Sequence, residues 1–519
     1  MDKKVETQVL IIGGGATGTG LARDLALRGV GCLLVEKQDI NAGASGANHG
    51  LLHSGARYIA SDPASATECR EESDLLKRLA PHCVETTGGL FVAVAGDDEA
   101  YIADFADRCG QCGIDAQAVE IKEALEMEPV LSPETIAVYS VPDACVDPFK
   151  LSLDNLADAQ AHGTTVLRNT KIVRFEKWGK HIERVHLENH RTGERFAIKA
   201  EMIVNATGAW AGNVAAMAGA KINTLCSQGS LIITQNRLSH RVINRLRKAT
   251  DGDILVPGGT VSIFGTTSVR IDDPEKKRPT VAEIDAMLPD GIAMVPKLAD
   301  TRFIRAYAGV RPLVQSTLTA DDRAVSRGFA LIDHSEDGIS NFMTITGGKL
   351  TTYRLMAEKT ADRVCAHLGV SETCQTRTTP LPATNAGKWT EAGLTPKMWF
   401  QKKDPSDLLL CECEMVPTSV VDNISANIQK EGGRISLREL GQRSRVGKGP
   451  CQGAFCSLRM TAHLYNEGLL TADQGLDELR DFLNERWRGV RPILWGQAVS
   501  QAELQEALHC GLYGLELSE

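Results

Sequence analysis

The sequence predicts an α/β fold, in which parallel strands alternate with helices, and two observations predict it. The apolar run of residues 9–12 breaks into glycines and is followed by the helical pattern of residues 21–27. A second apolar run, residues 32–35, then ends in Glu36. Strand, tight turn, helix and strand in this order form the first unit of a doubly wound parallel sheet.

The glycines of this turn, Gly13, Gly15 and Gly18, have the spacing G-x-G-x-x-G. One glycine makes the turn, one lets the backbone approach a pyrophosphate, and one lets the helix pack closely on the strand. The pyrophosphate then lies at the helix N-terminus, and Glu36, eighteen residues after Gly18, can accept hydrogen bonds from a ribose. The sequence therefore predicts a bound dinucleotide.

At 519 residues, of which 43% are hydrophobic, the chain can bury two or three cores. The net charge of -9 argues against a general nucleic-acid binder, because such proteins carry clustered basic residues. We expect no signal peptide, because the first four residues run directly into the first strand, and no transmembrane segment, because no apolar run approaches about 18 residues. These properties favour a protein of the cytosol or of a membrane surface, with small molecules and proteins as partners.

The loop of residues 44–58 is rich in glycine and small polar residues, which is typical of a loop that covers a cofactor. After it, strands are expected at residues 164–166, 172–175, 185–187 and 203–204. The last of them ends in Ala206, Thr207 and Gly208, which allows a second close approach of the backbone to the dinucleotide.

The middle of the chain predicts a separate antiparallel sheet, with strands at residues 230–234, 261–266, 304–310 and 329–333. An apolar run, residues 342–345, follows and leads through Gly347, Gly348 and Lys349 into a helix that reaches about Cys365. Strand, glycine pair and helix again direct backbone N–H groups, together with a lysine, at an anion.

Several motifs carry a resemblance to a known family: the glycine turn with Glu36, and the segments HSGARY (residues 53–58), GVRP (309–312), SR (326–327) and TGGKLTTY (346–353). Over residues 1 to about 370 they resemble the FAD-dependent glycerol-3-phosphate dehydrogenases, and as a whole the chain is similar to the catalytic subunits of the anaerobic bacterial enzymes. The resemblance implies a Rossmann-type FAD domain interleaved with a mixed or antiparallel substrate-binding sheet, as in D-amino-acid oxidase-like flavoproteins.

The resemblance also implies an activity, the oxidation of sn-glycerol 3-phosphate to dihydroxyacetone phosphate by hydride transfer to FAD. The electrons then leave through an iron-sulfur centre and partner flavin and iron-sulfur subunits to quinone in anaerobic respiration, at the cytoplasmic face of the inner membrane. The implied FAD-binding residues are Gly13, Gly15, Gly18, Glu36, Ser45, Asn48, Val173, Ala206, Gly208, Gly347, Gly348, Lys349, Leu350 and Thr351. The implied substrate-binding residues are Arg57, Tyr58, Arg311 and Arg327, and the implied catalytic residues are His53, Arg311 and Lys349.

The cations of this set suit a phosphorylated substrate. Arginine fits the phosphate because its planar fork binds two oxygens at once. Lys349 follows two glycines and precedes a helix, so it is better placed to stabilise an anionic reduced flavin. At one position the chain departs from the family: where relatives carry a lysine before Gly229, it has Gln228, so the anion contact of that lysine is not carried over.

His53 is the candidate proton acceptor for the substrate hydroxyl, because an imidazole titrates in the working range. The alternative is a histidine that only packs against the flavin ring. A non-catalytic flavin-binding subunit would need no such residue. A third possibility, an FAD-dependent dehydrogenase or oxidase of amino acids or 2-hydroxy acids, would need cations for one carboxylate only, which the set Arg57, Arg311, Arg327 and Lys349 disfavours.

Two close cysteine pairs follow a segment without periodicity. They are Cys411 with Cys413 and Cys451 with Cys456, on two loops with a helical stretch between them. Four converging thiolates in a reducing compartment favour an iron-sulfur cluster or zinc over disulfides. The pattern resembles the [2Fe-2S] domain of bacterioferritin-associated ferredoxins, although its second pair is spaced C-x4-C in place of C-x2-C. Structural zinc is the alternative.

We therefore expect four segments: an FAD-dependent oxidoreductase domain at 1–375, a linker at 376–405, a four-cysteine domain at 406–470 and a docking segment at 471–519. The last contains one amphipathic helix and, within residues 484–495, two tryptophans among arginines. Such residues are enriched at interfaces, so this segment either contacts a partner subunit or packs against its own chain.

Overall fold

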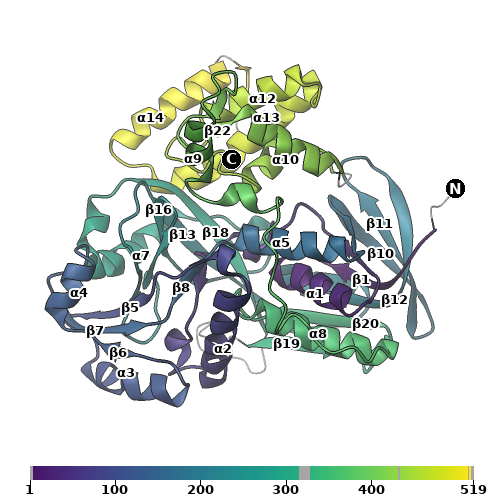
Figure 1. Cartoon of the computed structure of the whole chain (residues 1–519), viewed down its shortest axis with the longest axis horizontal. Helices are drawn as coiled ribbons and strands as arrows, with labels where there is room; N and C mark the ends of the chain where they lie inside the picture. Colours follow the sequence, from purple (N-terminus) through teal and green to yellow (C-terminus); the bar gives the residue numbers. More distant parts are fainter. Residues whose placement is uncertain (1–3, 315–327, 431–432, 512, 516–519) are drawn as a thin grey trace.

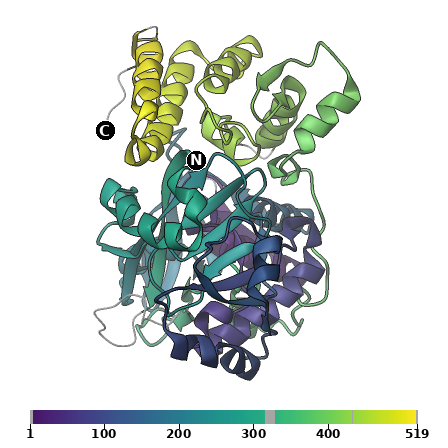
Figure 2. The ribbon, with the colours of Figure 1, turned by 90° about the vertical axis from the view of Figure 1, so that its left-hand side faces the viewer.

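The computed structural model describes residues 4–314, 328–430, 433–511 and 513–515 of the chain. Its elements form a parallel-centred sheet, a second sheet beside it, and a helical unit that lies over both (Figure 1, Figure 2). No helix within these ranges combines the length and the apolar character that a bilayer span requires.

The first sheet contains the strand, turn and helix unit that the sequence predicts. Its strand order is β10-β11-β12-β1-β2-β9, with β20 paired to β12 and β19 to β20. Strand β1 is parallel to both β2 and β12, and β20 is parallel to β12. The bounds are β1 (Lys4–Ile12), β2 (Cys32–Val35), β9 (Thr165–Leu167), β10 (Thr170–Trp178), β11 (His181–Asn189), β12 (Arg195–Asn205), β19 (Phe329–Asp333) and β20 (Phe342–Gly347).

Strand β1 is apolar on both faces because both faces of the sheet are covered. Val9 and Ile11 pack into a core with three helices, α1 (Ala16–Leu27), α5 (Pro148–Ala161) and α8 (Tyr353–Leu368). Leu10 and Ile12 point to the opposite face, where the β10–β11 hairpin and α6 (Ala211–Met217) pack. A continuous apolar run is the pattern expected of a central parallel strand.

The second sheet has the order β17-β13-β16-β15-β14-β5-β7-β6, and β18 pairs with β13. Its pairs are antiparallel except β14 with β5. The chain passes between the two sheets repeatedly, so the two parts are interleaved in sequence. The bounds are β5 (Gly89–Val94), β6 (Gln117–Ala118), β7 (Thr135–Val141), β13 (Thr224–Thr234), β14 (Val242–Arg245), β15 (Ile254–Gly258), β16 (Val261–Gly265), β17 (Val269–Ile271) and β18 (Phe303–Val314).

Smaller elements complete this part of the molecule. A three-stranded sheet of order β3-β8-β4 supports the loop of residues 44–58. Helix α7 packs on β13 and β5 of the second sheet. The bounds are β3 (Leu51–Leu52), β4 (Val84–Glu85), β8 (Ala144–Val146), α2 (Pro63–Leu79), α3 (Glu99–Gln111), α4 (Ile121–Met127) and α7 (Val281–Met294).

One strand was assigned to the wrong sheet by its sequence pattern. Residues 329–333 form β19, but β19 does not join the middle sheet. It pairs antiparallel with β20, in the register Phe329 to Gly347 and Ile332 to Thr344. The short connection of residues 334–341 makes β20 the nearest partner, and an apolar pattern indicates that a strand exists without specifying its neighbour.

Residues 388–515, so far as they are described, form a helical unit that we call the C-terminal unit (Figure 2). Its core is continuous from Trp389, inside the predicted linker, to Phe482 and Leu483, inside the predicted docking segment. Part of the predicted linker is therefore folded, and helix α13 packs against its own chain. The bounds are α9 (Leu394–Lys402), β21 (Leu409–Cys411), β22 (Val416–Pro417), α10 (Thr418–Lys430), α11 (Leu437–Gln442), α12 (Cys456–Asn466), α13 (Ala472–Val490) and α14 (Gln497–Glu506).

A buried ion pair joins the C-terminal unit to the first sheet. Arg443 Nη2 lies 2.8 Å from Asp39 Oδ1, and Arg168 Nε lies 3.2 Å from the same oxygen. All three side chains are at most 5% exposed. Burial favours a higher pKa for Asp39, but Arg443 and Arg168 outweigh it and hold the pKa of this carboxyl below its usual value. The carboxylate therefore stays charged between two arginines.

Replacing Asp39 with asparagine should destabilise the protein by about 3–5 kcal/mol, because it removes the carboxylate that pairs with two buried guanidinium groups. Denaturant unfolding followed by fluorescence measures this change. The matched control is Asp477→Asn, which breaks the exposed pair of Asp477 with Arg480 and should change the free energy of unfolding by no more than about 0.5 kcal/mol. Equal effects of the two substitutions would contradict the assigned role of Asp39.

Candidate functional site

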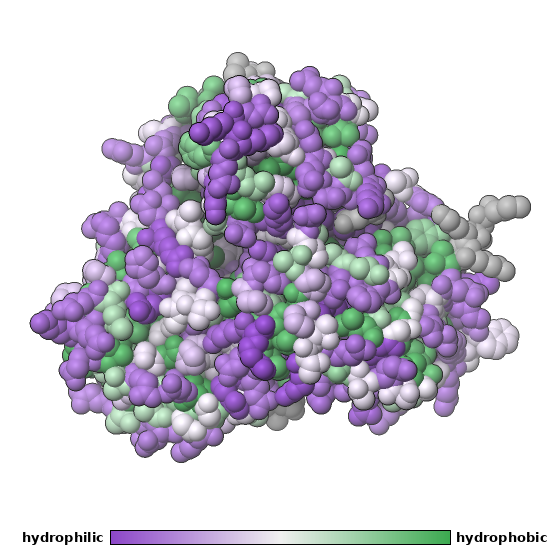
Figure 3. Space-filling view, in the orientation of Figure 1, coloured by the Kyte–Doolittle hydropathy of each residue, from purple (hydrophilic) through white to green (hydrophobic). Residues whose placement is uncertain are grey.

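A cavity of about 1830 Å³ lies between the two sheets and the C-terminal unit. The glycine turn, the ends of β12 and β20, the loop of residues 44–58 and β18 line it from below, and α11 and α13 line it from above. In Figure 3 the surface is hollowed where the C-terminal unit meets the rest of the chain.

The glycine turn brings the backbone of two strands close together. Gly13 has φ +112°, and a Cβ on it would lie 2.6 Å from the carbonyl oxygen of Ala206. A Cβ on Gly18 would lie 1.9 Å from the carbonyl oxygen of Gly13, so α1 could not pack on the turn. Above the turn, Ser45 Oγ accepts from the backbone N–H of Ala16 at 2.9 Å, in the first turn of α1. These features fit a pyrophosphate at the N-terminus of α1.

Glu36 ends β2 at the edge of the same cavity. Its carboxylate accepts from the backbone N–H groups of Gly14 and Gln38, both at 2.7 Å. Burial raises the pKa of Glu36, although the two N–H groups lower it. An acceptor held at the end of β2 fits the ribose hydroxyls of a dinucleotide.

The other residues expected to bind FAD lie on the cavity wall, with two exceptions, Thr351 and Val173. Asn48 holds the loop of residues 44–58 through its side-chain amide, which donates to Ser45 O at 2.7 Å. Thr351 is buried behind the cavity, where its hydroxyl accepts from the backbone N–H of His53 at 3.2 Å. Val173 is 40% exposed at a bulge of β10 and does not line the cavity, whereas Ile172 does. Those on the wall are Gly13, Gly15, Glu36, Ser45, Asn48, Ala206, Gly208, Gly347, Gly348, Lys349 and Leu350.

Arg311 lies on β18, and its guanidinium group occupies the space that Gly229 leaves on the neighbouring strand. A Cβ on Gly229 would lie 2.3 Å from Arg311 Nη2. Gly229 and Gly309 are directly paired on β13 and β18, and a Cβ on Gly309 would lie 2.0 Å from the carbonyl oxygen of Ala47. Arg311 Nη1 donates to the carbonyl of Thr267 at 3.1 Å, and Nη2 donates to the hydroxyl of Thr266. The paired glycines thus leave room for both the arginine and the loop of residues 44–58.

Arg57 lies on the same cavity wall, and one of its two terminal nitrogens pairs with a carboxylate of this chain. Its Nη2 lies 2.9 Å from Asp253 Oδ2, while Nη1 is buried and has no hydrogen-bond partner within the described part of the chain. An orphaned guanidinium nitrogen on a cavity wall fits an anionic ligand. Arg327, the remaining expected substrate contact, lies outside the described residues.

His53, Tyr58 and Lys349 form a second group in the cavity. Lys349 Nζ lies 4.7 Å from the ring centroid of Tyr58, and the Tyr58 hydroxyl lies 3.5 Å from His53 Nε2. Burial, His49, Arg57 and Lys349 together hold the pKa of His53 well below its usual value. His53 is therefore neutral at neutral pH and can accept a proton.

Gln228 faces away from this site. Its side-chain amide donates to Arg278 O at 2.9 Å and to Glu283 Oε2 at 3.0 Å, on the α7 side of the second sheet. Gln228 is 4% exposed and is absent from the cavity wall, which its neighbour Gly229 lines. Gln228 therefore lies behind the sheet and not on the cavity wall.

Sequence reasoning missed His49 and Tyr307, which also line the cavity. The Tyr307 hydroxyl donates to the Asn48 carbonyl at 2.7 Å, and the ring centroids of His49 and His53 lie 5.8 Å apart. A second histidine four residues before His53, in a glycine-rich loop, was the available signal. Tyr307 had none, because it stands in an ordinary strand pattern.

The four cysteines lie together in the C-terminal unit, on β21, at the start of α12 and on the loops beside them. Cys413 Sγ is 3.9 Å from Cys411 Sγ and 3.7 Å from Cys451 Sγ. Two thiolates on one tetrahedral metal ion are about 3.8 Å apart, given metal–sulfur bonds of about 2.3 Å. The Cys413 thiol lowers the pKa of Cys411, but Cys456 and burial raise it more, to about 12. Cys413 is within ligand distance of two neighbouring thiols, but no three of the four Sγ atoms lie within 4.8 Å of one another, so the thiols lie in neighbouring pairs and not around one point.

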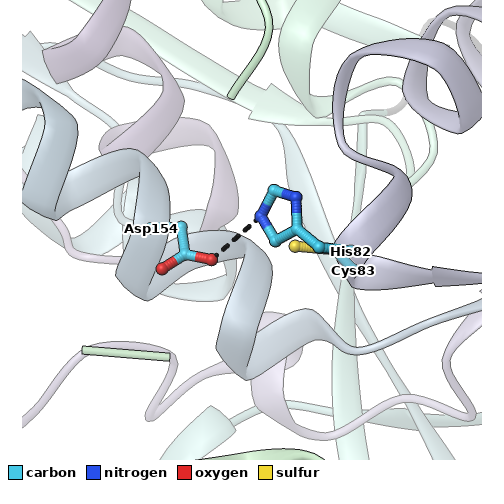
Figure 4. Close-up of side chains that lie close together, drawn as sticks. All are labelled: His82, Cys83 and Asp154. Carbon is cyan, nitrogen blue, oxygen red and sulfur yellow. Dashed lines mark hydrogen bonds and ion pairs between the residues drawn. The ribbon is translucent and has the colours of Figure 1, made fainter. Parts of the chain in front are cut away.

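A second group with metal-ligand chemistry has a structural explanation. His82, Cys83 and Asp154 lie close to one another (Figure 4). Asp154 Oδ2 contacts His82 Nε2 at 3.1 Å, and Oδ1 already accepts from the backbone N–H of Thr384 at 3.1 Å and from its hydroxyl. The group therefore anchors the segment before the C-terminal unit to α5.

Comparisons with known proteins agree with this geometry. Residues 8–363 match the family described as FAD dependent oxidoreductase (DAO). One subunit of the anaerobic glycerol-3-phosphate dehydrogenase of Escherichia coli (strain K12) is 43% identical over 98% of this chain and 97% of its own length. The corresponding subunit from Haloferax volcanii is 38% identical over 98% of this chain and 90% of its own length.

A solved structure supports the fold. Glycerol-3-phosphate dehydrogenase from Bacillus halodurans, complexed with FAD, superposes with a TM-score of 0.64 at 21% identity and covers 95% of this chain and 96% of its own. The predicted α/β fold of an FAD-dependent oxidoreductase is thereby confirmed. The chain belongs to the FAD-dependent oxidoreductases of the DAO family and, within them, to the family of these anaerobic glycerol-3-phosphate dehydrogenase subunits.

Proposed function

We propose that this chain is the catalytic subunit that oxidises sn-glycerol 3-phosphate to dihydroxyacetone phosphate with FAD. The observation that supports this most is the composition of one cavity. It combines the glycine turn and Glu36 with Arg311, Arg57, Lys349 and a neutral His53. One carboxylate would need fewer cations, so the cavity favours a phosphate over an amino acid or 2-hydroxy acid.

Arg311 and Arg57 would bind the substrate phosphate. Two threonine oxygens orient the Arg311 guanidinium, and Asp253 orients that of Arg57, so little side-chain entropy remains to be lost on binding. Removal of water from such a site strengthens the pairing of each arginine with a phosphate oxygen.

His53 would accept the proton of the substrate hydroxyl, because it is neutral and lies beside Tyr58 and Lys349. FAD, when bound, supplies the hydride acceptor. Lys349 would hold positive charge near the cofactor, at the end of β20 and before α8. The substrate carbon then loses one hydride and its hydroxyl one proton, which gives the ketone.

The four-cysteine site would carry the electrons out of the cavity, as a [2Fe-2S] cluster held by Cys411, Cys413, Cys451 and Cys456. A continuous loop connects the two sites, since Lys448, three residues before Cys451, lines the cavity and lies 4.9 Å from the ring of Phe149. A one-electron centre suits delivery to partner flavin and iron-sulfur subunits and then to quinone, at the cytoplasmic face of the inner membrane. Structural zinc is the alternative occupant.

Arg311→Ala should lower kcat/KM for glycerol 3-phosphate about 10- to 100-fold, because a charge-assisted hydrogen bond to the substrate is lost. Bound FAD, measured by absorbance after gel filtration, should stay unchanged. The matched control is Gln228→Lys on the paired strand β13, which faces α7 and should leave KM unchanged. A value of kcat/KM within a few-fold of the unsubstituted protein would refute the role of Arg311.

If His53 is the proton acceptor, the rate of flavin reduction should not depend on pH above about 6.5. The pKa of His53 in the folded protein lies below its usual value of 6.5, so the imidazole is already deprotonated in this range. The rate should fall only at lower pH, where the base becomes protonated. Rapid mixing at saturating substrate measures it. His53→Gln should lower the rate across the whole range, and an unchanged rate would favour a histidine that only packs against the flavin.

The anaerobically purified protein should contain roughly two irons and two sulfides per chain and show a paramagnetic signal when reduced. Cys451→Ser should remove that signal and slow electron delivery to the physiological acceptor, while reduction of the flavin by substrate continues. Cys510→Ser, a cysteine of the same unit outside the four, is the control. Stoichiometric zinc in place of iron would rule the cluster out.

A further inference from the structure

The backbone on both sides of His49 is fixed by hydrogen bonds to different elements. The Tyr307 hydroxyl on β18 donates to the Asn48 carbonyl at 2.7 Å. The Gly50 carbonyl accepts from the backbone N–H of Val146 on β8 at 2.7 Å, and the Gly50 N–H donates to Asn48 Oδ1 at 2.7 Å. His49 is therefore presented to the cavity from a loop that is held at both of its ends.

The imidazole of His49 has a defined tautomer. Its Nδ1 accepts from the backbone N–H of Leu51 at 3.1 Å, so this nitrogen carries no proton. In the neutral ring the proton is then on Nε2, which becomes the single donor. Within the described residues Nε2 makes no hydrogen bond, and the ring lines the cavity. The ring thus keeps one directed N–H group for a ligand.

The surroundings keep this ring neutral. Burial, Arg311 and Arg57 lower the pKa of His49 to about 3. The ring of His53 lies edge-on to it, with the two planes at 72°. The two residues before His49 lie against β18, since Asn48 accepts from Tyr307 and Ala47 lies over Gly309. Because β18 also carries Arg311, His49 lies near that arginine on the cavity wall.

We propose that His49 is a substrate-binding residue whose Nε2–H donates to the phosphate that Arg311 and Arg57 hold. This inference rests on the proposed function and adds a neutral donor to its anion site. A phosphate dianion offers three oxygens with several lone pairs, more than Arg57 Nη1 and the Arg311 guanidinium can satisfy. A neutral donor satisfies another lone pair without adding to the repulsion between the two arginines.

Two substitutions separate the two ring nitrogens. His49→Asn keeps an acceptor near Nδ1 for the Leu51 N–H and removes the distal donor, whereas His49→Gln places an amide N–H near the position of Nε2. We expect His49→Asn to raise KM for glycerol 3-phosphate about tenfold or more, with bound FAD and the maximal rate of flavin reduction within about threefold of the original. His49→Gln should restore most of the affinity. His186→Asn, on β11 outside the cavity, is the control histidine and should change neither parameter.

Inorganic phosphate, used as a competitive inhibitor, measures anion binding separately from the oxidation of the substrate. Its inhibition constant should rise with His49→Asn in proportion to KM. A lower maximal rate with KM unchanged, or no change in either parameter, would overturn the proposal. If Arg311→Ala raises KM and His49→Asn does not, only the role of His49 fails. If the protein does not oxidise glycerol 3-phosphate at all, the proposed function fails, and the role of His49 fails with it.

Discussion

The close approach of two backbones at the glycine turn is the constraint on which the rest of the structure depends. Strands β1 and β12 run parallel and end side by side, and only a residue without a Cβ at position 13 avoids the Ala206 carbonyl. The absence of a Cβ at Gly18 lets α1 start directly above the turn. Both conditions must hold before a cavity can form at the carboxyl edge of the sheet. The second sheet repeats the principle, because the paired Gly229 and Gly309 make room for Arg311 and for the loop above it.

The cavity combines cations with imidazoles that are kept neutral. Arg311, Arg57 and Lys349 lie near His49 and His53, and together with burial they make protonation of either ring unfavourable. In the proposed function, the same cations that would attract an anionic substrate keep a proton acceptor available. Substrate recognition and proton transfer would then depend on one electrostatic arrangement.

Local features of this molecule could be predicted from the sequence, and features that depend on which surfaces meet could not. Local signals of this kind are the glycine turn, Glu36 at the end of a strand, the glycine pair at 347–348 and each of the two cysteine pairs. Each can be recognised from a short stretch of sequence. The strand that pairs with β19 is set by the short connection of residues 334–341 to β20, and the apolar pattern of residues 329–333 carries no information about that partner. The side of the sheet that Gln228 faces depends on the register of β13 with β18. The extent of the C-terminal core was missed because Trp389 lies among residues without periodicity.

The shared cavity has a thermodynamic consequence for the C-terminal unit. Its walls come from the two sheets below and from α11 and α13 above, so a ligand that touches both walls binds more tightly when the unit is docked. By linkage, the free energy by which docking tightens the ligand equals the free energy by which the ligand tightens docking. The buried pair of Asp39 with Arg443 contributes to the free energy of docking before any ligand is bound. For a cofactor that touches both walls, cofactor retention and the docking of the four-cysteine site are two equilibria that share one coupling free energy.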